Sequence, residues 1–169
     1  MEQLTFNYIT EDYRLFIDSS RTSLKAVLLH NGNQIPAIPV AHAVHMKETY
    51  ENLRNLLQKL NYEQFKWCVC ADLKVIAIIT GLQGGYTKHC CFLCHWDSRA
   101  KEQYTITKWP PRKQLVPGEM NVANEPLVDP QKIFLPPLHI KLGLMKVFVK
   151  ALKRDGEAFN HFKKTVPKT

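Results

Sequence analysis

Alternating apolar and polar residues mark the first strand-like segments of the chain. In residues 13–18, Tyr13, Leu15 and Ile17 fall on one side of an extended backbone, which is the two-residue period of a half-buried strand. Residues 23–30 carry a second apolar run of similar length. The pattern therefore predicts two strands early in the chain, with a short connection between them.

Turn and proline signals define the next segment. Asn31-Gly32 is a strong hairpin signal, because both residues tolerate positive φ. The following apolar run, residues 34–40, contains Pro36 and Pro39, neither of which can donate a ladder hydrogen bond. We expect this third strand to lie at a sheet edge or to be bent.

Helical spacing replaces alternation in the middle of the chain. Residues 48–60 form the first predicted helix, and its apolar face consists of Tyr50, Leu53, Leu57 and Leu60. Residues 65–71 then form a nearly continuous apolar run that suits a buried fourth strand and ends at Asp72. Residues 73–82 mix β-branched residues with helical spacing, and we predict a helix that Asp72 caps and the glycines at 84–85 end.

The composition of the chain changes in its second half. Residues 97–137 hold seven of the ten prolines, which predicts an irregular excursion. A last helix is expected from about Leu138, and its inward-facing residues are predicted to be Leu138, Leu142, Met145, Val149 and Leu152. We divide the chain into an N-terminal extension at 1–12, a core at 13–96, a proline-rich insertion at 97–137, and a C-terminal helical segment with a basic tail at 138–169.

Two aspartates end the first and fourth predicted strands. The order of elements predicts a mixed α/β sheet, in which three antiparallel strands are followed by a helix and a fourth strand parallel to the first. Asp18 and Asp72 would then meet at the ends of neighbouring strands. Such carboxylates suit magnesium or manganese, which take substrate phosphates as further ligands and assist phosphodiester cleavage. Taken singly, Asp18 also fits a turn and Asp72 a helix N-cap.

Three segments resemble the RNase H-like catalytic core of cut-and-paste DNA transposases: FIDSSRTSLKAVLLHNG, CVCADLKVIAIITGLQGGYTKHCCFLCHW and LPPLHIKLGLMKVF. The similarity covers about residues 13–153. It is greatest to transposases with a Cys-x-x-Cys insertion after the second catalytic aspartate and a later histidine, namely CACTA-type elements, the Transib group and the related immunoglobulin-gene recombinase. The resemblance implies an RNase H-like sheet, a catalytic metal site and a structural zinc site. The residues in these roles would be Asp18 and Asp72 for the catalytic metal, and Cys91, Cys94 and His139 for zinc.

The same resemblance implies a third acid on a later helix. Asp155 and Glu157 are its nearby candidates, and no convincing fifth strand precedes them. We therefore expect a domain derived from a transposable element, built for metal-dependent DNA cleavage and strand transfer in recombination but with an incomplete acidic set and little activity. The alternative is a non-catalytic, zinc-stabilised module that binds nucleic acid or protein.

Three of the five cysteines lie within residues 88–96. Cys91 and Cys94 have the Cys-x-x-Cys spacing of a zinc-binding turn, whereas a structural zinc site usually has four ligands. The candidates for the fourth ligand are His89, Cys90 and His95, or a residue lost with the C-terminus. Ordinary buried thiols, a redox pair and a Cys-x-x-Cys-His haem attachment are the other readings, and the last generally needs an exported chain.

A formal net charge of +8 favours a polyanionic partner, which we expect to be DNA, and a solvated basic face is the alternative. The basic excess falls late in the chain, where Lys146, Lys150 and Lys153 are candidate phosphate contacts on one side of the last helix. No apolar run is long enough to span a bilayer, and the first residues lack a secretory pattern. We therefore expect no membrane partner and a nuclear or cytoplasmic location, while a homo-oligomer stays open.

Overall fold

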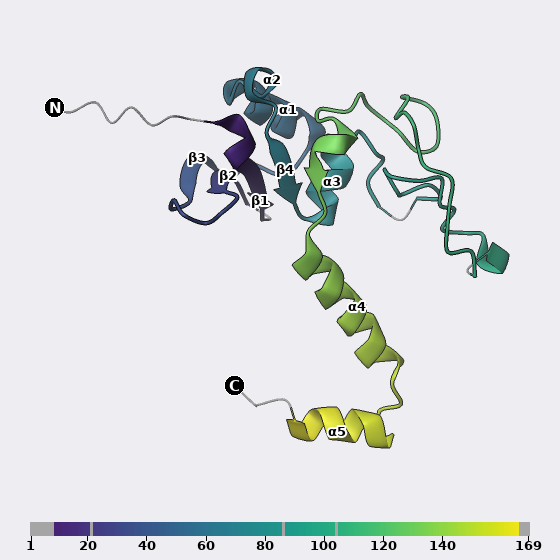
Figure 1. The fold of residues 1–169 in the computed structure, drawn as a ribbon. Helices are drawn as coiled ribbons and strands as arrows, with labels where there is room; N and C mark the ends of the chain where they lie inside the picture. The colour runs from purple at the N-terminus through teal and green to yellow at the C-terminus, as the bar shows by residue number, and fades with distance from the viewer. Residues whose placement is uncertain (1–8, 21, 86, 104, 166–169) are drawn as a thin grey trace. The chain divides into compact units, whose positions relative to one another are not determined.

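The computed structural model describes residues 9–20, 22–85, 87–103 and 105–165. The chain divides into two compact units, Met1–Leu135 and Pro136–Thr169. The first unit is a mixed α/β structure built on one open five-stranded sheet, with strand order β3-β2-β1-β4-β5 (Figure 1). The predicted α/β class is therefore confirmed.

The antiparallel half of the sheet follows the alternation of its sequence. β1 (Tyr13–Ser19) pairs with β2 (Ser23–His30), and β2 pairs with β3 (Ile38–Val44). Leu15 and Ile17 of β1 are fully buried, while the residues next to them are half-buried or exposed. Burial of an aliphatic side chain contributes roughly 1.5–3 kcal/mol relative to exposure. The apolar period therefore decides which face of the strand packs into the core.

β3 occupies a sheet edge, as its prolines predict. Pro39 pairs with Val27 beside a shift in the register. A turn does form at Asn31–Gly32, where the backbone N–H of Asn33 donates to His30 O at 3.1 Å. The predicted two-residue hairpin connection is wrong, because residues 31–37 connect β2 to β3 and, among them, only Asn33 has positive φ, at 51°. The strand consequently begins later than the sequence pattern indicates.

Helices supply the other side of the core. α1 (Tyr50–Lys59) begins after Thr49, whose hydroxyl accepts a hydrogen bond from the backbone N–H of Asn52 at 3.3 Å. α2 (Tyr62–Phe65) is a single turn, and α3 (Leu73–Ile79) follows β4. The buried helix residues are Leu53 and Leu57 from α1, Tyr62 from α2, and Val75, Ile76 and Ile79 from α3. Both predicted helices in this part of the chain are confirmed, with shorter bounds.

The parallel half of the sheet contains one predicted and one unpredicted strand. β4 (Cys68–Ala71) pairs in parallel with β1, as the order of elements predicts. β5 (Ile133–Phe134) lies on the other side of β4, with Val69 paired to Ile133. β5 is not predicted from the sequence, because two residues inside a proline-rich segment show no alternation of apolar and polar positions.

An irregular excursion connects α3 to β5, as the proline content predicts. It includes the short 3-10 helices η2 (Lys101–Gln103) and η3 (Pro130–Lys132), while η1 (Thr10–Asp12) precedes β1. Apolar residues of the excursion join the core of the first unit, namely Phe92, Leu115, Val122 and Val128. Burial of these apolar side chains therefore packs the excursion against the core formed by the sheet and the helices.

Gly81 permits a close return of the excursion to the end of α3. Its φ is +74°, and a Cβ at this position would lie 2.0 Å from the carbonyl oxygen of Asn124. The carbonyl of Gly81 accepts a hydrogen bond from the backbone N–H of Ala123 at 2.7 Å, and Leu127 N–H donates to Ile79 O at 2.8 Å. Glycine is required here both by the left-handed backbone and by the lack of space.

The second unit consists of α4 (Pro137–Ala151) and α5 (Glu157–Thr165). The rings of Phe148 and Phe162 make an edge-to-face contact between these helices, with centroids 6.2 Å apart. The predicted last helix is confirmed, but it ends before Lys153. No residue of α4 is buried, so the predicted inward-facing stripe is wrong for this unit taken by itself. Among the described residues, no helix combines the length and apolar character needed to cross a membrane.

Candidate functional site

The two predicted aspartates lie at the carboxyl ends of neighbouring strands. β1 and β4 are parallel, and their register places Ile17 opposite Ala71, the residue before each aspartate. Asp18 and Asp72 are therefore the next pair along this register, on strands that in a sheet lie about 4.8 Å apart. The predicted parallel pairing of the first and fourth strands is confirmed.

Alternation along β1 directs Asp18 away from the core. Ile17 is fully buried, so Asp18 belongs to the opposite face of the sheet, where it is exposed. Lys25 of β2 is its cross-strand neighbour. Among the described residues, none forms an ion pair with Asp18. The interpretation of Asp18 as a turn residue is wrong, because β1 continues to Ser19.

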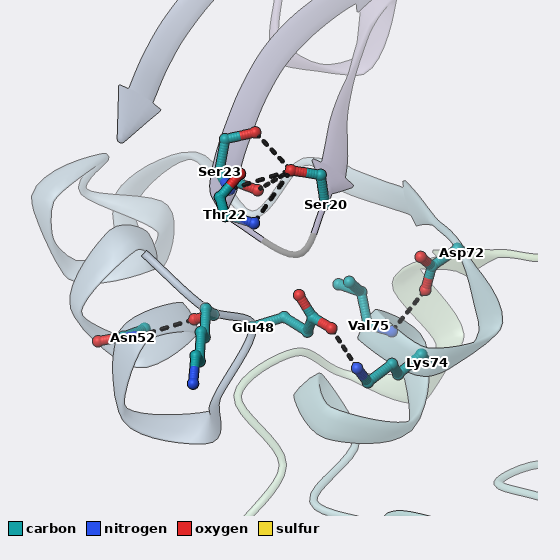
Figure 2. Close-up of polar contacts among 9 residues, drawn as sticks. Ser20, Thr22, Ser23, Glu48, Asn52, Asp72, Lys74 and Val75 are labelled. Atoms are coloured by element: carbon teal, nitrogen blue, oxygen red, sulfur yellow. Dashed lines mark hydrogen bonds and ion pairs between the residues drawn. The ribbon is translucent and has the colours of Figure 1, made fainter. Parts of the chain in front are cut away.

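Asp72 caps α3, as the alternative reading of the sequence predicts. Its Oδ1 accepts a hydrogen bond from the backbone N–H of Val75 at 2.8 Å (Figure 2). No hydrogen bond from a described residue reaches its second carboxylate oxygen. Capping thus fixes the side chain and leaves one oxygen available for a further ligand.

Serines close the turn that follows Asp18. Ser20 Oγ accepts a hydrogen bond from the backbone N–H of Ser23 at 3.0 Å, and the two hydroxyl oxygens are 2.7 Å apart (Figure 2). The backbone N–H of Ser20 also donates to Ser23 O at 2.8 Å. These bonds hold the end of β1 against β2, and so restrict the backbone beside Asp18.

Lys74, two residues after Asp72, forms an ion pair with Glu48 (Figure 2). The Glu48 side chain is 13% exposed, whereas that of Lys74 is 68% exposed. The hydrogen bond from Lys74 lowers the pKa of Glu48, and burial acts in the opposite direction. The pair ties the segment before α1 to the first turn of α3. The Glu48–Lys74 ion pair is not predicted from the sequence, because its two residues lie on separate elements.

A third acid does not join the two aspartates in the described part of the chain. There, no group of three or more histidine, cysteine, aspartate or glutamate side chains is arranged to hold a metal ion. The predicted candidates belong to the second unit, where Asp155 precedes α5 and Glu157 begins it. Their participation stays a prediction.

Cys91 and Cys94 direct their sulfurs at each other. The two Sγ atoms are 3.2 Å apart, and all five cysteines of the chain are free thiols. Burial raises the pKa of Cys94, and its hydrogen bond with Cys91 acts in the same direction. Two thiols on one Cys-x-x-Cys turn are a ligand pair that zinc sites use.

A short antiparallel ladder holds the cysteine pair against the proline-rich excursion. Cys94 forms a β-bridge with Pro111, and the backbone N–H of Arg112 donates to Leu93 O at 2.9 Å. Phe92, between the two cysteines, is buried in the core. The position of the pair therefore depends on residues about twenty positions later in the chain.

The candidates for the fourth zinc ligand differ in their surroundings. His95 Nδ1 lies 3.0 Å from Met120 Sδ. His89 Nδ1 is buried and has no hydrogen-bond partner among the described residues, and Cys90 is half-buried, with its pKa raised by burial. His139 lies on α4 in the second unit, so its pairing with the cysteines stays a prediction.

A separate groove of about 830 Å³ lies along α1, α2 and residues 124–127. Glu51, Glu63 and Glu125 line it together with Arg54, so its charge is predominantly negative. None of the predicted site residues lines this groove. It is distinct from both the aspartate pair and the cysteine cluster.

Two protein-family models together match most of the chain. A family described as Domain of unknown function (DUF8703) matches residues 1–128. The chain belongs to this family. The DUF8703 match contains both aspartates and the Cys-x-x-Cys pair. A second family, Domain of unknown function (DUF8704), matches residues 137–169, which agrees with the boundary of the second compact unit. No curated protein matches the chain.

Proposed function

We propose that the first unit is an RNase H-like domain of transposase origin that binds divalent metal for phosphodiester chemistry on DNA. The observation that carries this proposal is the parallel pairing of β1 and β4, with Asp18 and Asp72 next in register at one end of the sheet. The strand order supports it as well, because an antiparallel first half is followed by a parallel second half, as the resemblance to transposases implies.

Asp18 and Asp72 fit magnesium or manganese by their chemistry and by their availability. Both offer carboxylate oxygens; Asp18 is exposed without an ion-pair partner among the described residues, and Asp72 keeps one oxygen outside its cap. When bound, such ions complete their coordination with water and phosphate oxygens and stabilise charge on a phosphodiester under attack. The chain's own contribution is to hold the two carboxylates, one by the sheet and one by the helix cap.

We expect this chain to bind manganese but to cleave DNA weakly or not at all. Two carboxylates leave most of the coordination to water, and among the described residues no third acid joins them. The incomplete set favours binding over catalysis, which keeps the predicted non-catalytic, nucleic-acid- or protein-binding module as the second candidate function.

Manganese titration followed by paramagnetic broadening of NMR signals tests the site. Asp18→Asn and Asp72→Asn should each weaken binding about tenfold or more, since each removes one anionic ligand at constant shape. Asp129→Asn is a matched control, because Asp129 likewise caps a helix, accepting from Gln131 N–H at 2.9 Å. Unchanged binding in both test variants would exclude the site. Strong DNA cleavage by the unaltered chain would contradict the incomplete set and direct attention to Asp155 and Glu157.

A structural zinc ion at Cys91 and Cys94 is the second part of the proposal. The Cys-x-x-Cys turn supports it by bringing the two sulfurs together, and so does the buried His89 Nδ1, which has no hydrogen-bond partner among the described residues. His139 is the further ligand that the transposase resemblance implies. Zinc would be expected to stabilise the excursion, because the binding free energy of a structural site is coupled to folding.

DNA is the proposed partner of the whole chain. The net charge is +8, and Lys146 and Lys150 are one helical turn apart on α4. Lys153 follows the end of that helix, and all three side chains are exposed. These residues are suited to contact phosphates without reading bases, which favours sequence-independent binding.

A further inference from the structure

A row of polar residues crosses the sheet beside Asp18. Asp18 is paired with Lys25 of β2, and Lys25 is paired in turn with His42 of β3. Residues directly opposite each other in an antiparallel ladder share a face, so the three side chains follow one another across one face of the sheet. All three residues are exposed. Because Asp72 is next in register on the other side of Asp18, the row continues into the proposed metal site.

The neighbouring row on the same face is apolar. Phe16, two residues before Asp18 on β1, is paired with Val27 of β2 and with Cys70 of β4. These three residues are half-buried. The change from half-buried apolar residues to exposed polar ones therefore falls at the end of the sheet that holds the two aspartates.

Lys25 can reach Asp18 but is not held by it. Opposite residues in an antiparallel ladder have Cβ atoms about 4.5–5.5 Å apart, and lysine carries its ammonium group on a flexible four-carbon stem. In the described part of the chain, neither Lys25 nor Asp18 forms an ion pair. An exposed ion pair would contribute little to stability in any case, so the ammonium group is available to another anion.

The charge of the proposed metal site indicates which anion this is. Two carboxylates and one divalent ion sum to zero, so a DNA phosphodiester bound there brings a negative charge that the aspartates and the ion do not offset. A lysine ammonium is a compact positive charge with three N–H donors, and it suits a phosphate oxygen. Without metal, the two carboxylates repel a phosphate. Lys25 therefore complements DNA when the aspartates hold their ion.

We propose that Lys25 binds the DNA phosphate that lies beside Asp18 and Asp72. The proposal rests on the proposed function, because it needs metal binding by the two aspartates. It assigns a substrate contact to β2, separate from the phosphate contacts proposed for α4. The sequence alone does not indicate Lys25, since the antiparallel register decides which residue of β2 lies opposite Asp18.

The salt dependence of DNA binding, with and without manganese, tests this contact. With manganese, Lys25→Gln should reduce the slope of log K against log salt by about 1, as expected for the loss of one phosphate contact. With a chelator instead, its slope should equal that of the unaltered chain. Lys25→Arg should keep the slope in both conditions, because it keeps the charge. Fluorescence anisotropy of a labelled short duplex, at one manganese concentration for all variants, measures these slopes.

Lys59→Gln is the matched control for the loss of charge. Lys59 is an exposed lysine of α1 in the same unit and has no ion pair among the described residues. Its replacement lowers the net charge equally and should leave the salt slope unchanged with or without manganese. The comparison separates a local phosphate contact from general attraction between DNA and a basic protein.

Manganese binding separates the proposed role from a structural one. Removal of a neighbouring cation favours a bound dication, so Lys25→Gln should bind manganese at least as tightly as the unaltered chain, although it binds DNA more weakly. Damage to this end of the sheet would weaken both. Weaker manganese binding by Lys25→Gln would therefore overturn the proposal.

The remaining outcomes distinguish failure of the metal site from failure of the lysine contact. Unchanged manganese binding in Asp18→Asn and Asp72→Asn would overturn the metal site and the role of Lys25 with it. Loss of manganese in those variants, with equal salt slopes for Lys25→Gln and Lys59→Gln, would overturn the role of Lys25 alone. An equal loss of slope with and without manganese would also overturn it, because the contact would not belong to the metal-loaded site.

Discussion

At the residue scale, Asp72 has two roles that substitution can separate. Its carboxylate caps α3 through Val75 N–H, and the proposed metal site uses its remaining oxygen. Asparagine can accept the same capping hydrogen bond, whereas alanine cannot. We expect Asp72→Ala to lower the free energy of unfolding by about 1 kcal/mol, and Asp72→Asn to lower it by only a few tenths. Urea denaturation without metal measures both changes.

The two variants should nevertheless lose manganese to the same extent, because both lack the carboxylate. An Asp72→Asn variant as unstable as Asp72→Ala would mean that charge, and not the capping bond, stabilises α3. Retention of full manganese affinity in either variant would contradict the metal role of this residue while leaving its role as a cap intact.

At the scale of elements, Gly81 determines how the excursion joins the core. Gly81→Ala would place a methyl group against the carbonyl of Asn124 and force alanine into a left-handed conformation. We expect it to lower the free energy of unfolding by more than about 2 kcal/mol, since the conformation alone costs about 1–2 kcal/mol. Thermal or urea denaturation measures the change.

Gly84→Ala is the matched control for this prediction. A Cβ at Gly84 meets nothing within 4 Å, and the residue is exposed. The same chemical change three residues away should therefore leave stability unchanged or slightly higher. Equal destabilisation by both substitutions would contradict the role assigned to the contact with Asn124.

The elements that are predicted well from the sequence are those whose apolar residues recur at one regular spacing. β1, α1 and α3 each bury residues at regular spacing, because one face of each element packs into a common core. β5 and the Glu48–Lys74 pair escape prediction, since each depends on a contact between segments far apart in the sequence. The connection after β2 is longer than predicted, because Asn31–Gly32 indicates a two-residue connection whereas β3 begins only at Ile38, after Pro36.

At the scale of the whole molecule, topology explains what could be predicted about the site. Asp18 and Asp72 are found because one crossover places the first and fourth strands in parallel. The bridge between Cys94 and Pro111 is not predicted, because a proline-rich segment carries no periodic signal. The pairing of His139 with the cysteines, which lie in the other unit, is still a prediction.

The net charge of +8 is a property of the whole chain, and its distribution decides how DNA would be bound. Phosphate contacts release counterions, so the logarithm of the binding constant falls with the logarithm of salt concentration by about 0.9 for each contact with duplex DNA. Binding driven only by net charge would respond to the loss of any lysines. Binding through α4 and its C-terminal end would respond to particular ones.

Replacement of Lys146, Lys150 and Lys153 by glutamine should therefore weaken binding to a short duplex at low salt and reduce the salt slope by about 2–3. The matched control replaces three exposed lysines of the first unit, Lys59, Lys66 and Lys101, and lowers the net charge equally. Its salt slope should stay close to that of the unaltered chain. Fluorescence anisotropy at several salt concentrations measures the salt slopes of the unaltered chain and of both triple variants. Equal loss of slope in both triple variants would assign DNA attraction to net charge alone, and a salt-independent affinity of the unaltered chain would contradict phosphate binding altogether.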